Sequence, residues 1–124
     1  MIKFKELKIW NESMQLVTDI YALTSKFPNH EKFCLSQQIN RATISIPSNV
    51  AEGCGRESKK ELLHFLNIAN ASSFELQTQV IIAHQLDYIN KINLDGLEDK
   101  IDHIQKMIYR LKQKIISSDY TQSA

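Results

Sequence analysis

Two side chains with the spacing of metal ligands are the first candidates for chemistry in this chain. Glu61 and His64 stand three residues apart, which places both on one face of a helix, as in di-iron bundles. Such a site needs a second Glu-x-x-His pair and two further inward-facing carboxylates, and the chain has no second pair. We therefore interpret His64 as a surface histidine and predict neither a metal site nor a cofactor.

Nucleophilic and phosphate-binding motifs give no better case for an active site. Cys34 and Cys54 belong to no Cys-His-Asn order, and no Gly-x-Ser-x-Gly elbow occurs. Both thiols are expected to stay reduced, because the chain lacks a disulfide-rich pattern. Residues 53–58 are glycine-rich, but they lack the Gly-Lys-Ser/Thr ending of a phosphate loop, so we interpret them as a turn. We predict that the protein is not an enzyme and has no catalytic residues.

Contact with phosphates is the one chemistry that the charged residues favour. The net charge of +1 excludes a polycation, so nucleic-acid binding would need a local patch. Two clusters of cations could supply it: Lys106, Arg110 and Lys114, at helical four-residue steps, and then Arg56, Lys59 and Lys60. Between residues 100 and 114, five cations accompany a single acid. We expect sequence-tolerant, salt-sensitive contacts without aromatic stacking, or else simply a solvated helix face.

The elements that position these residues are expected to be long helices in a single domain. The 124 residues contain only three glycines and two prolines, which disfavours a fold with many turns. The ordered core is predicted over about residues 4–116, and the polar tail 117–124 is predicted to fray. The chain shows neither a secretory signal nor a run of about 20 apolar residues, so a cytoplasmic location is expected.

Apolar residues with helical periodicity predict an all-α, antiparallel four-helix bundle. The expected helices cover residues 7–26, 30–52, 58–89 and 95–116. The predicted N-caps are Asn29, Ser58 (paired with Glu61 in a capping box) and Asp95. The expected end of the second helix is at Gly53 and Gly55. Pro47 should bend that helix, the alternative being two short helices broken beside it.

The first and third predicted helices carry more apolar residues than a lone bundle would cover. Apolar stripes occupy much of the circumference of residues 58–89, which implies neighbours on more than one side. We therefore expect the protein to associate with copies of itself.

A polar stripe on the second helix has an unusual composition, because it lacks the lysines and glutamates of a solvent face. Its members are Gln38, Arg41, Ser45, Asn49 and Glu52. We interpret the stripe as a hydrogen-bond network that fixes helix register, with Glu75 as one possible partner for Arg41. A functional surface is the alternative.

The same region carries a recognisable motif. Residues 38–53 read Gln-x-x-Arg-Ala-x-x-Ser-Ile-Pro-x-Asn-Val-Ala-Glu-Gly, and 65–79 read Phe-Leu-x-Ile-Ala-x-Ala-Ser-x-x-Glu-Leu-x-Thr-Gln. With Leu7-x-x-Trp10, Tyr21 and Phe27-Pro28 before them, they make the chain resemble the four-helix-bundle proteins encoded in 23S ribosomal RNA intervening sequences. The resemblance extends over about residues 4–116 and implies structural roles for the motif residues Gln38, Arg41, Ser45, Pro47, Asn49, Glu52, Gly53 and Glu75.

The resemblance implies a ring-shaped homopentamer of four-helix bundles with no known enzymatic activity. A relative, the accessory variability determinant of diversity-generating retroelements, is similar in being a basic barrel that binds nucleic acid. This chain departs from that basic character with its net charge of +1. Two functions therefore stand as alternatives: an RNA-binding accessory protein, or a structural scaffold that contacts only proteins.

Overall fold

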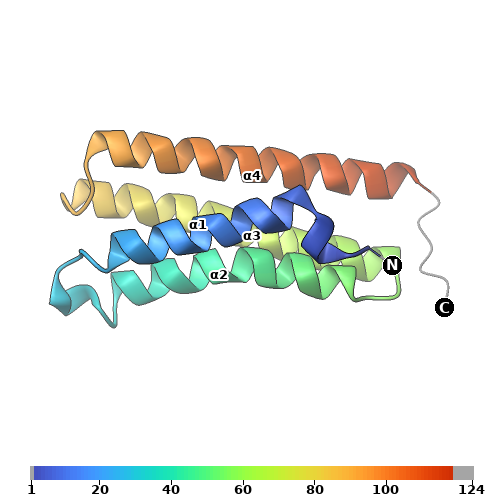
Figure 1. Ribbon diagram of the computed structural model, residues 1–124, viewed down its shortest axis with the longest axis horizontal. Coiled ribbons are helices and arrows are strands. Elements are labelled where there is room, and N and C mark those ends of the chain that lie inside the picture. The colour runs from blue at the N-terminus through green and yellow to red at the C-terminus, as the bar shows by residue number, and fades with distance from the viewer. Residues whose placement is uncertain (1, 119–124) are drawn as a thin grey trace.

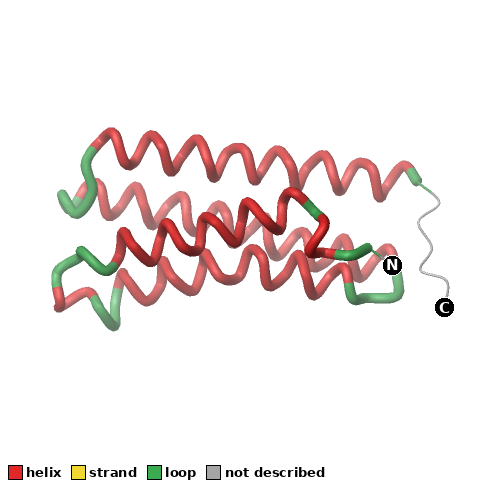
Figure 2. Tube along the Cα trace, viewed as in Figure 1, coloured by secondary structure: helices red, strands yellow, loops and turns green. Residues whose placement is uncertain are grey.

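Four antiparallel helices run along the length of the molecule (Figures 1 and 2), as predicted. The computed structural model describes residues 2–118, so most of the predicted frayed tail lies outside the described residues. The elements, in chain order, are η1 (Phe4–Glu6), α1 (Lys8–Thr24), η2 (Asn29–Glu31), α2 (Leu35–Cys54), α3 (Lys59–Gln85) and α4 (Lys91–Ser117). Within that range, no helix is both long and apolar enough to cross a bilayer.

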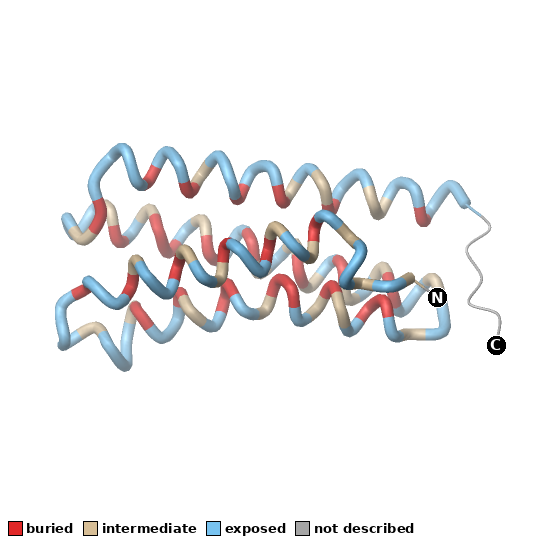
Figure 3. Tube along the Cα trace, viewed as in Figure 1, coloured by how far each residue is buried: buried red, intermediate tan, exposed pale blue. Residues whose placement is uncertain are grey.

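Aliphatic side chains from all four helices form one core. Figure 3 shows buried positions recurring along each of the helices. Leu16, Ile46, Leu66 and Ile104 each expose at most 2% of their surface. Burial of such a side chain stabilises the fold by about 1.5–3 kcal/mol, and the core contains eighteen buried leucine, isoleucine, valine and phenylalanine residues. Among the four pairs of neighbouring helices, α2 and α3 form the most extensive contact, and α1 and α4 form the least extensive.

The start of α2 differs from the prediction, because Asn29 does not cap it. Residues 29–31 form a separate 3-10 turn, and α2 begins only at Leu35. The Glu31 carboxylate accepts a hydrogen bond from the Leu35 amide at 3.4 Å and another from the Tyr88 hydroxyl at 2.8 Å. This one side chain therefore supports the first turn of α2 and connects residues 29–31 to the turn that follows α3.

α2 continues without a break through Pro47, so the alternative of two short helices is wrong. The predicted bend at Pro47 stays a prediction. The helix also runs past Gly53 to Cys54, and Gly55 caps it with a φ of −84°. Neither glycine adopts the left-handed conformation of a typical glycine C-cap.

The predicted N-cap of α3 is confirmed, whereas the predicted N-cap of α4 is wrong. The Ser58 hydroxyl accepts a hydrogen bond from the Glu61 amide at 3.0 Å and so caps α3 as predicted. Asp95 does not cap α4. Instead the Asn90 side chain accepts from the Asn93 amide at 2.8 Å and starts the helix earlier, while Asp95 pairs with Lys91 within the first turns.

Candidate functional site

The antiparallel topology gathers positive charge at one end of the bundle. Residues 2–8, 52–61 and 110–118 meet at the end of the molecule where the N-terminus and the α2–α3 turn lie (Figure 1). We call these three segments the basic end. They hold nine of the fifteen lysines and arginines but only four of the fourteen acids. The rest of the described chain holds six of these cations and nine acids, so the bundle is electrically polar along its axis.

A hydrogen-bonded contact joins two of the three segments of the basic end. The Lys59 ammonium, in the first turn of α3, donates to the carbonyl oxygens of Ile116 at 3.2 Å and Ser118 at 2.8 Å. A cation at the carboxyl end of α4 also complements the negative end of that helix dipole. Lys59 therefore holds the ends of α3 and α4 together, and its two acceptors are carbonyl oxygens, not carboxylates.

The cations of the predicted stripe on α4 fall into two groups: some form ion pairs with acids, and the others do not. Lys106 pairs with Asp102 at 3.0 Å, and one turn earlier Lys100 pairs with Asp19 of α1 at 2.9 Å. Arg110 and Lys114 are exposed and make no ion pair with any residue that the structure describes. Counting the charges of residues 100–114 alone omits Asp19, which comes from α1. With both ion pairs included, the unpaired cations of α4 are those nearer its C-terminal end.

In the second predicted cluster, only Lys60 projects without a partner. Arg56 pairs with Glu52 on the last turns of α2 and lies over the Phe65 ring, 4.8 Å from its centroid. Lys60 is exposed and forms no ion pair within residues 2–118. The two predicted clusters thus belong to one surface, with Lys60, Arg110 and Lys114 as its unpaired cations.

Sequence reasoning missed an aromatic residue on the same helix face. Tyr109 lies between Lys106 and Arg110 on α4, and its side chain is 63% exposed. The expectation that no aromatic residue accompanies the cations is therefore wrong. The signal was present in the sequence, because a residue three positions after Lys106 must share its face of the helix.

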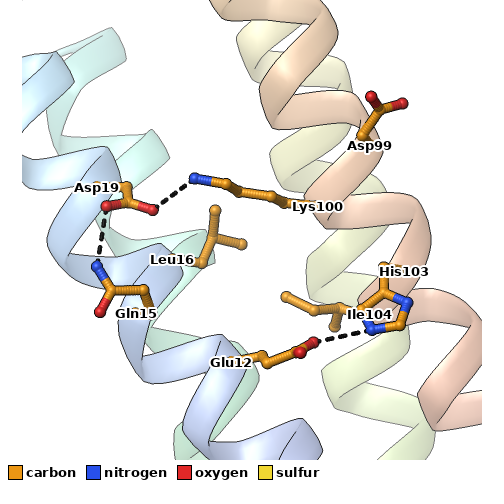
Figure 4. Close-up of a pocket in the computed structure, with 8 residues that line it drawn as sticks. All are labelled: Glu12, Gln15, Leu16, Asp19, Asp99, Lys100, His103 and Ile104. Carbon is orange, nitrogen blue, oxygen red and sulfur yellow. Dashed lines mark hydrogen bonds and ion pairs between the residues drawn. The ribbon is translucent and has the colours of Figure 1, made fainter.

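A groove of about 340 Å³ lies between α1 and α4, away from the basic end (Figure 4). Its apolar floor contains Leu16 and Ile104, and two polar contacts cross it. One is the Asp19–Lys100 ion pair, and the other joins the His103 ring to the Glu12 carboxylate at 3.1 Å. These contacts connect the two helices that pack least closely, which indicates a structural role.

The Asp19–Lys100 ion pair makes a small, pH-dependent contribution to stability. The hydrogen bond from Lys100 lowers the pKa of Asp19, against the opposing effect of partial burial, and Gln15 also donates to this carboxylate. A carboxyl whose pKa is lowered by folding stabilises the protein above its unfolded pKa of about 3.9. That stabilisation is lost as the pH falls through the folded pKa.

We therefore expect Asp19→Asn to reduce the free energy of unfolding at pH 7 by less than about 1 kcal/mol, since the pair is partly exposed. The difference from wild type should shrink as the pH is lowered below about 4. Urea unfolding at pH 7 and pH 3 measures both values. Asp99→Asn is the control, because Asp99 lines the same groove without an ion pair to any described residue. An equal pH dependence for both variants would contradict this account.

The polar stripe of α2 lines a hollow of about 430 Å³ against α3. The Ser45 and Ser72 hydroxyls are 2.8 Å apart, and the Asn49 amide donates to the carbonyl and hydroxyl oxygens of Ser45. Arg41 and Glu75 border this hollow, both exposed, yet they form no ion pair with each other. The hydrogen bonds that cross the α2–α3 seam here come from the two serines.

Gln38 also lines this hollow, whereas the motif residues Pro47, Glu52 and Gly53 lie nearer the basic end. Glu52 pairs with Arg56, and Pro47 is buried beneath the apolar groove that α2 forms with α1. Gly53 packs directly against the first turn of α3. The motif residues therefore serve several contacts along α2 and do not converge on a single point.

Cys54 and His64, two of the residues considered for catalysis or metal binding, lack the surroundings that such chemistry needs. Burial raises the pKa of the Cys54 thiol to about 11, which keeps it protonated at neutral pH. His64 is exposed and packs edge-on against the Phe65 ring. Across residues 2–118, no group of three or more His, Cys, Asp or Glu side chains could hold a metal ion.

Comparisons with known proteins agree with this architecture. The profile of the 23S rRNA-intervening sequence protein family matches residues 5–110. A crystal structure of a protein of unknown function from the S23 ribosomal protein family of Bacteroides thetaiotaomicron is similar, with a TM-score of 0.79 and 23% sequence identity. The match covers 85% of this chain and 95% of that one, and it shows a shared fold. No curated protein matches the chain.

Proposed function

The chain belongs to the 23S rRNA-intervening sequence protein family, and we propose that it is a non-enzymatic, oligomeric accessory protein whose basic end binds nucleic-acid phosphates. The observation that carries this proposal is the convergence of three separate segments into one surface with nine cations and four acids. Lysine and arginine contacts to phosphate release counterions, so they bind without regard to sequence.

Self-association strengthens the basic surface, and the exposed apolar residues support it. A groove between α1 and α2 is lined by Trp10, Met14 and Ile44, and Met14 and Ile44 are 42% and 40% exposed. On α3, Phe74 and Ile82 are exposed by 53% and 39%. We propose that the groove of one copy receives the α3 ridge of the next, which joins unlike surfaces and closes a ring. The resemblance favours five copies.

Ring symmetry has a direct electrostatic consequence for these basic ends. A rotation about one axis leaves the height of every atom along that axis unchanged, so all copies place their basic ends at the same level. Their fields then add to a band of positive potential, although one chain carries a net charge of only +1.

A structural scaffold without nucleic-acid binding is the second candidate, favoured by the pairing of Lys106 with Asp102 and of Arg56 with Glu52. Both pairs reduce the charge that the sequence alone indicates. The two functions predict different results in one experiment: only the first predicts that the protein retains nucleic acid at low salt.

A charge-reversal experiment tests the proposed function. We expect the triple variant Lys60→Glu, Arg110→Glu, Lys114→Glu, which reverses the unpaired cations of the basic end, to bind a structured RNA more than about tenfold more weakly than wild type in filter-binding titrations. The matched control changes three exposed cations outside the basic end, namely Lys26→Glu, Lys32→Glu and Lys91→Glu. It alters the net charge equally and should change the affinity by less than about threefold. Equal losses in both triple variants, or no binding by wild type, would favour the scaffold.

A further inference from the structure

Tyr109 is the most exposed aromatic side chain of α4, and the contacts within the bundle give it no structural role. Its ring is 63% exposed, whereas Ile104, Ile108 and Ile115 of the same helix are buried, so Tyr109 lies on the outward face of α4. The hydroxyl makes no hydrogen bond with any other residue of the described chain. An aromatic ring in that position presents a flat apolar surface to whatever approaches α4.

The neighbours of Tyr109 on the helix surface are cations and an amide. Lys106 lies one turn before it, and Lys112 and Gln113 lie one turn after it. Arg110 is next to it in the sequence and projects about 100° further around the helix axis. Arg110 and Lys112 form no ion pair with the residues that the structure describes. The face therefore combines a stacking surface with groups that attract phosphates.

We propose that this face of α4 binds an unpaired segment of nucleic acid, with one base stacked on the Tyr109 ring and flanking phosphates contacted by Arg110 and Lys112. The inference rests on the proposed function and deepens it by naming the class of substrate. A base can lie flat on an aromatic ring only when its own face is accessible, which a duplex prevents along its length. Stacking accepts any base, so the site distinguishes single strands from duplexes and does not distinguish sequences.

The test compares two Tyr109 variants on single-stranded and double-stranded probes. Fluorescence anisotropy is measured with a labelled 12-nucleotide RNA without self-complementarity, with DNA of the same sequence, and with the RNA duplex. Tyr109→Ala should weaken single-strand binding by about fivefold or more, since stacking of one base contributes about 1–3 kcal/mol. Binding of the duplex should change by less than about twofold, and Tyr109→Phe should preserve both affinities because it keeps the ring.

Phe33→Ala is the control, because Phe33 is 77% exposed and lies on the segment before α2, at the opposite end of the bundle. It should change neither affinity. The RNA and DNA arms show whether the 2′-hydroxyl contributes to binding. Equal weakening of single strands and duplex by Tyr109→Ala, or no weakening, would overturn the stacking site. If the triple glutamate variant loses affinity for both single strands and duplex while Tyr109→Ala does not, the stacking site is wrong but the proposed function still holds. The failure of one proposal can therefore be told apart from the failure of the other.

Discussion

Gly53→Val is expected to lower the free energy of unfolding by about 3 kcal/mol, whereas Gly96→Ala is expected to raise it by about 0.5–1 kcal/mol. Both glycines lie within helices, so a general preference for alanine or valine over glycine cannot explain opposite signs. The contrast depends on what a new side chain would meet.

A Cβ atom added at Gly53 would lie 3.0 Å from Cβ of Phe65, 3.1 Å from Cδ1 of Leu62 and 3.2 Å from the Leu62 carbonyl oxygen. A Cβ and a backbone carbonyl cannot swing aside as the end of a long side chain can. The first turn of α3 must therefore move away from α2, and the two further methyl groups of valine enlarge that movement.

A Cβ atom at Gly96 would meet nothing within 4 Å, so alanine there only improves helix propensity. Thermal unfolding followed by circular dichroism at one fixed protein concentration measures both variants. A change of 1 kcal/mol corresponds to about 4 °C for a domain of this size. A Gly53→Val variant as stable as wild type would show that α2 and α3 do not pack as closely as described.

Single substitutions on either apolar surface should reduce the proposed assembly to a 14.3 kDa monomer. Ile44→Glu places a charge in the α1–α2 groove, and Phe74→Glu places one on the α3 ridge. A carboxylate buried without a partner would strongly oppose association. Ile92→Glu is the control, because Ile92 is 81% exposed but lies on neither surface.

Light scattering coupled to size exclusion measures these masses, and mixing the two variants tests how the surfaces pair. The Ile44→Glu chain keeps an intact ridge, and the Phe74→Glu chain keeps an intact groove. An equimolar mixture should therefore give a species of about twice the monomer mass, as joining of unlike surfaces requires. A wild-type mass near 14.3 kDa would contradict self-association, and a mixture without heterodimers would contradict the pairing of groove with ridge.

The bundle could be predicted from the sequence because its apolar periodicity is regular. The repeat of Leu97, Ile101, Ile104, Ile108 and Ile115 forms the buried side of α4, and each of these residues exposes at most 8% of its surface. The cap of α3 could be predicted for a similar reason, since Ser58 and Glu61 are local neighbours. The start of α2 could not, because it depends on Glu31 and on Tyr88, which is 57 residues distant in the chain.

The sequence allowed us to predict which cations form the candidate site, but not how they are arranged in space. The sequence shows both clusters of cations, yet only the antiparallel topology brings Lys60 to the same end as Arg110 and Lys114. Conversely, the neutralising carboxylate of Asp19 comes from another helix and is invisible to a local count along α4. The net charge of a surface can therefore be estimated only when the acids of the neighbouring helices are counted as well.

The salt dependence of RNA affinity tests the central claim most directly. Filter-binding titrations of wild-type protein with one structured RNA between about 50 and 200 mM salt give the slope of log affinity against log salt. Phosphate contacts by Lys60, Arg110 and Lys114 predict a slope of about −3, or steeper if several copies engage one RNA. Absence of binding at 50 mM salt, or an affinity that does not change with salt, would contradict the claim that the basic end binds phosphates.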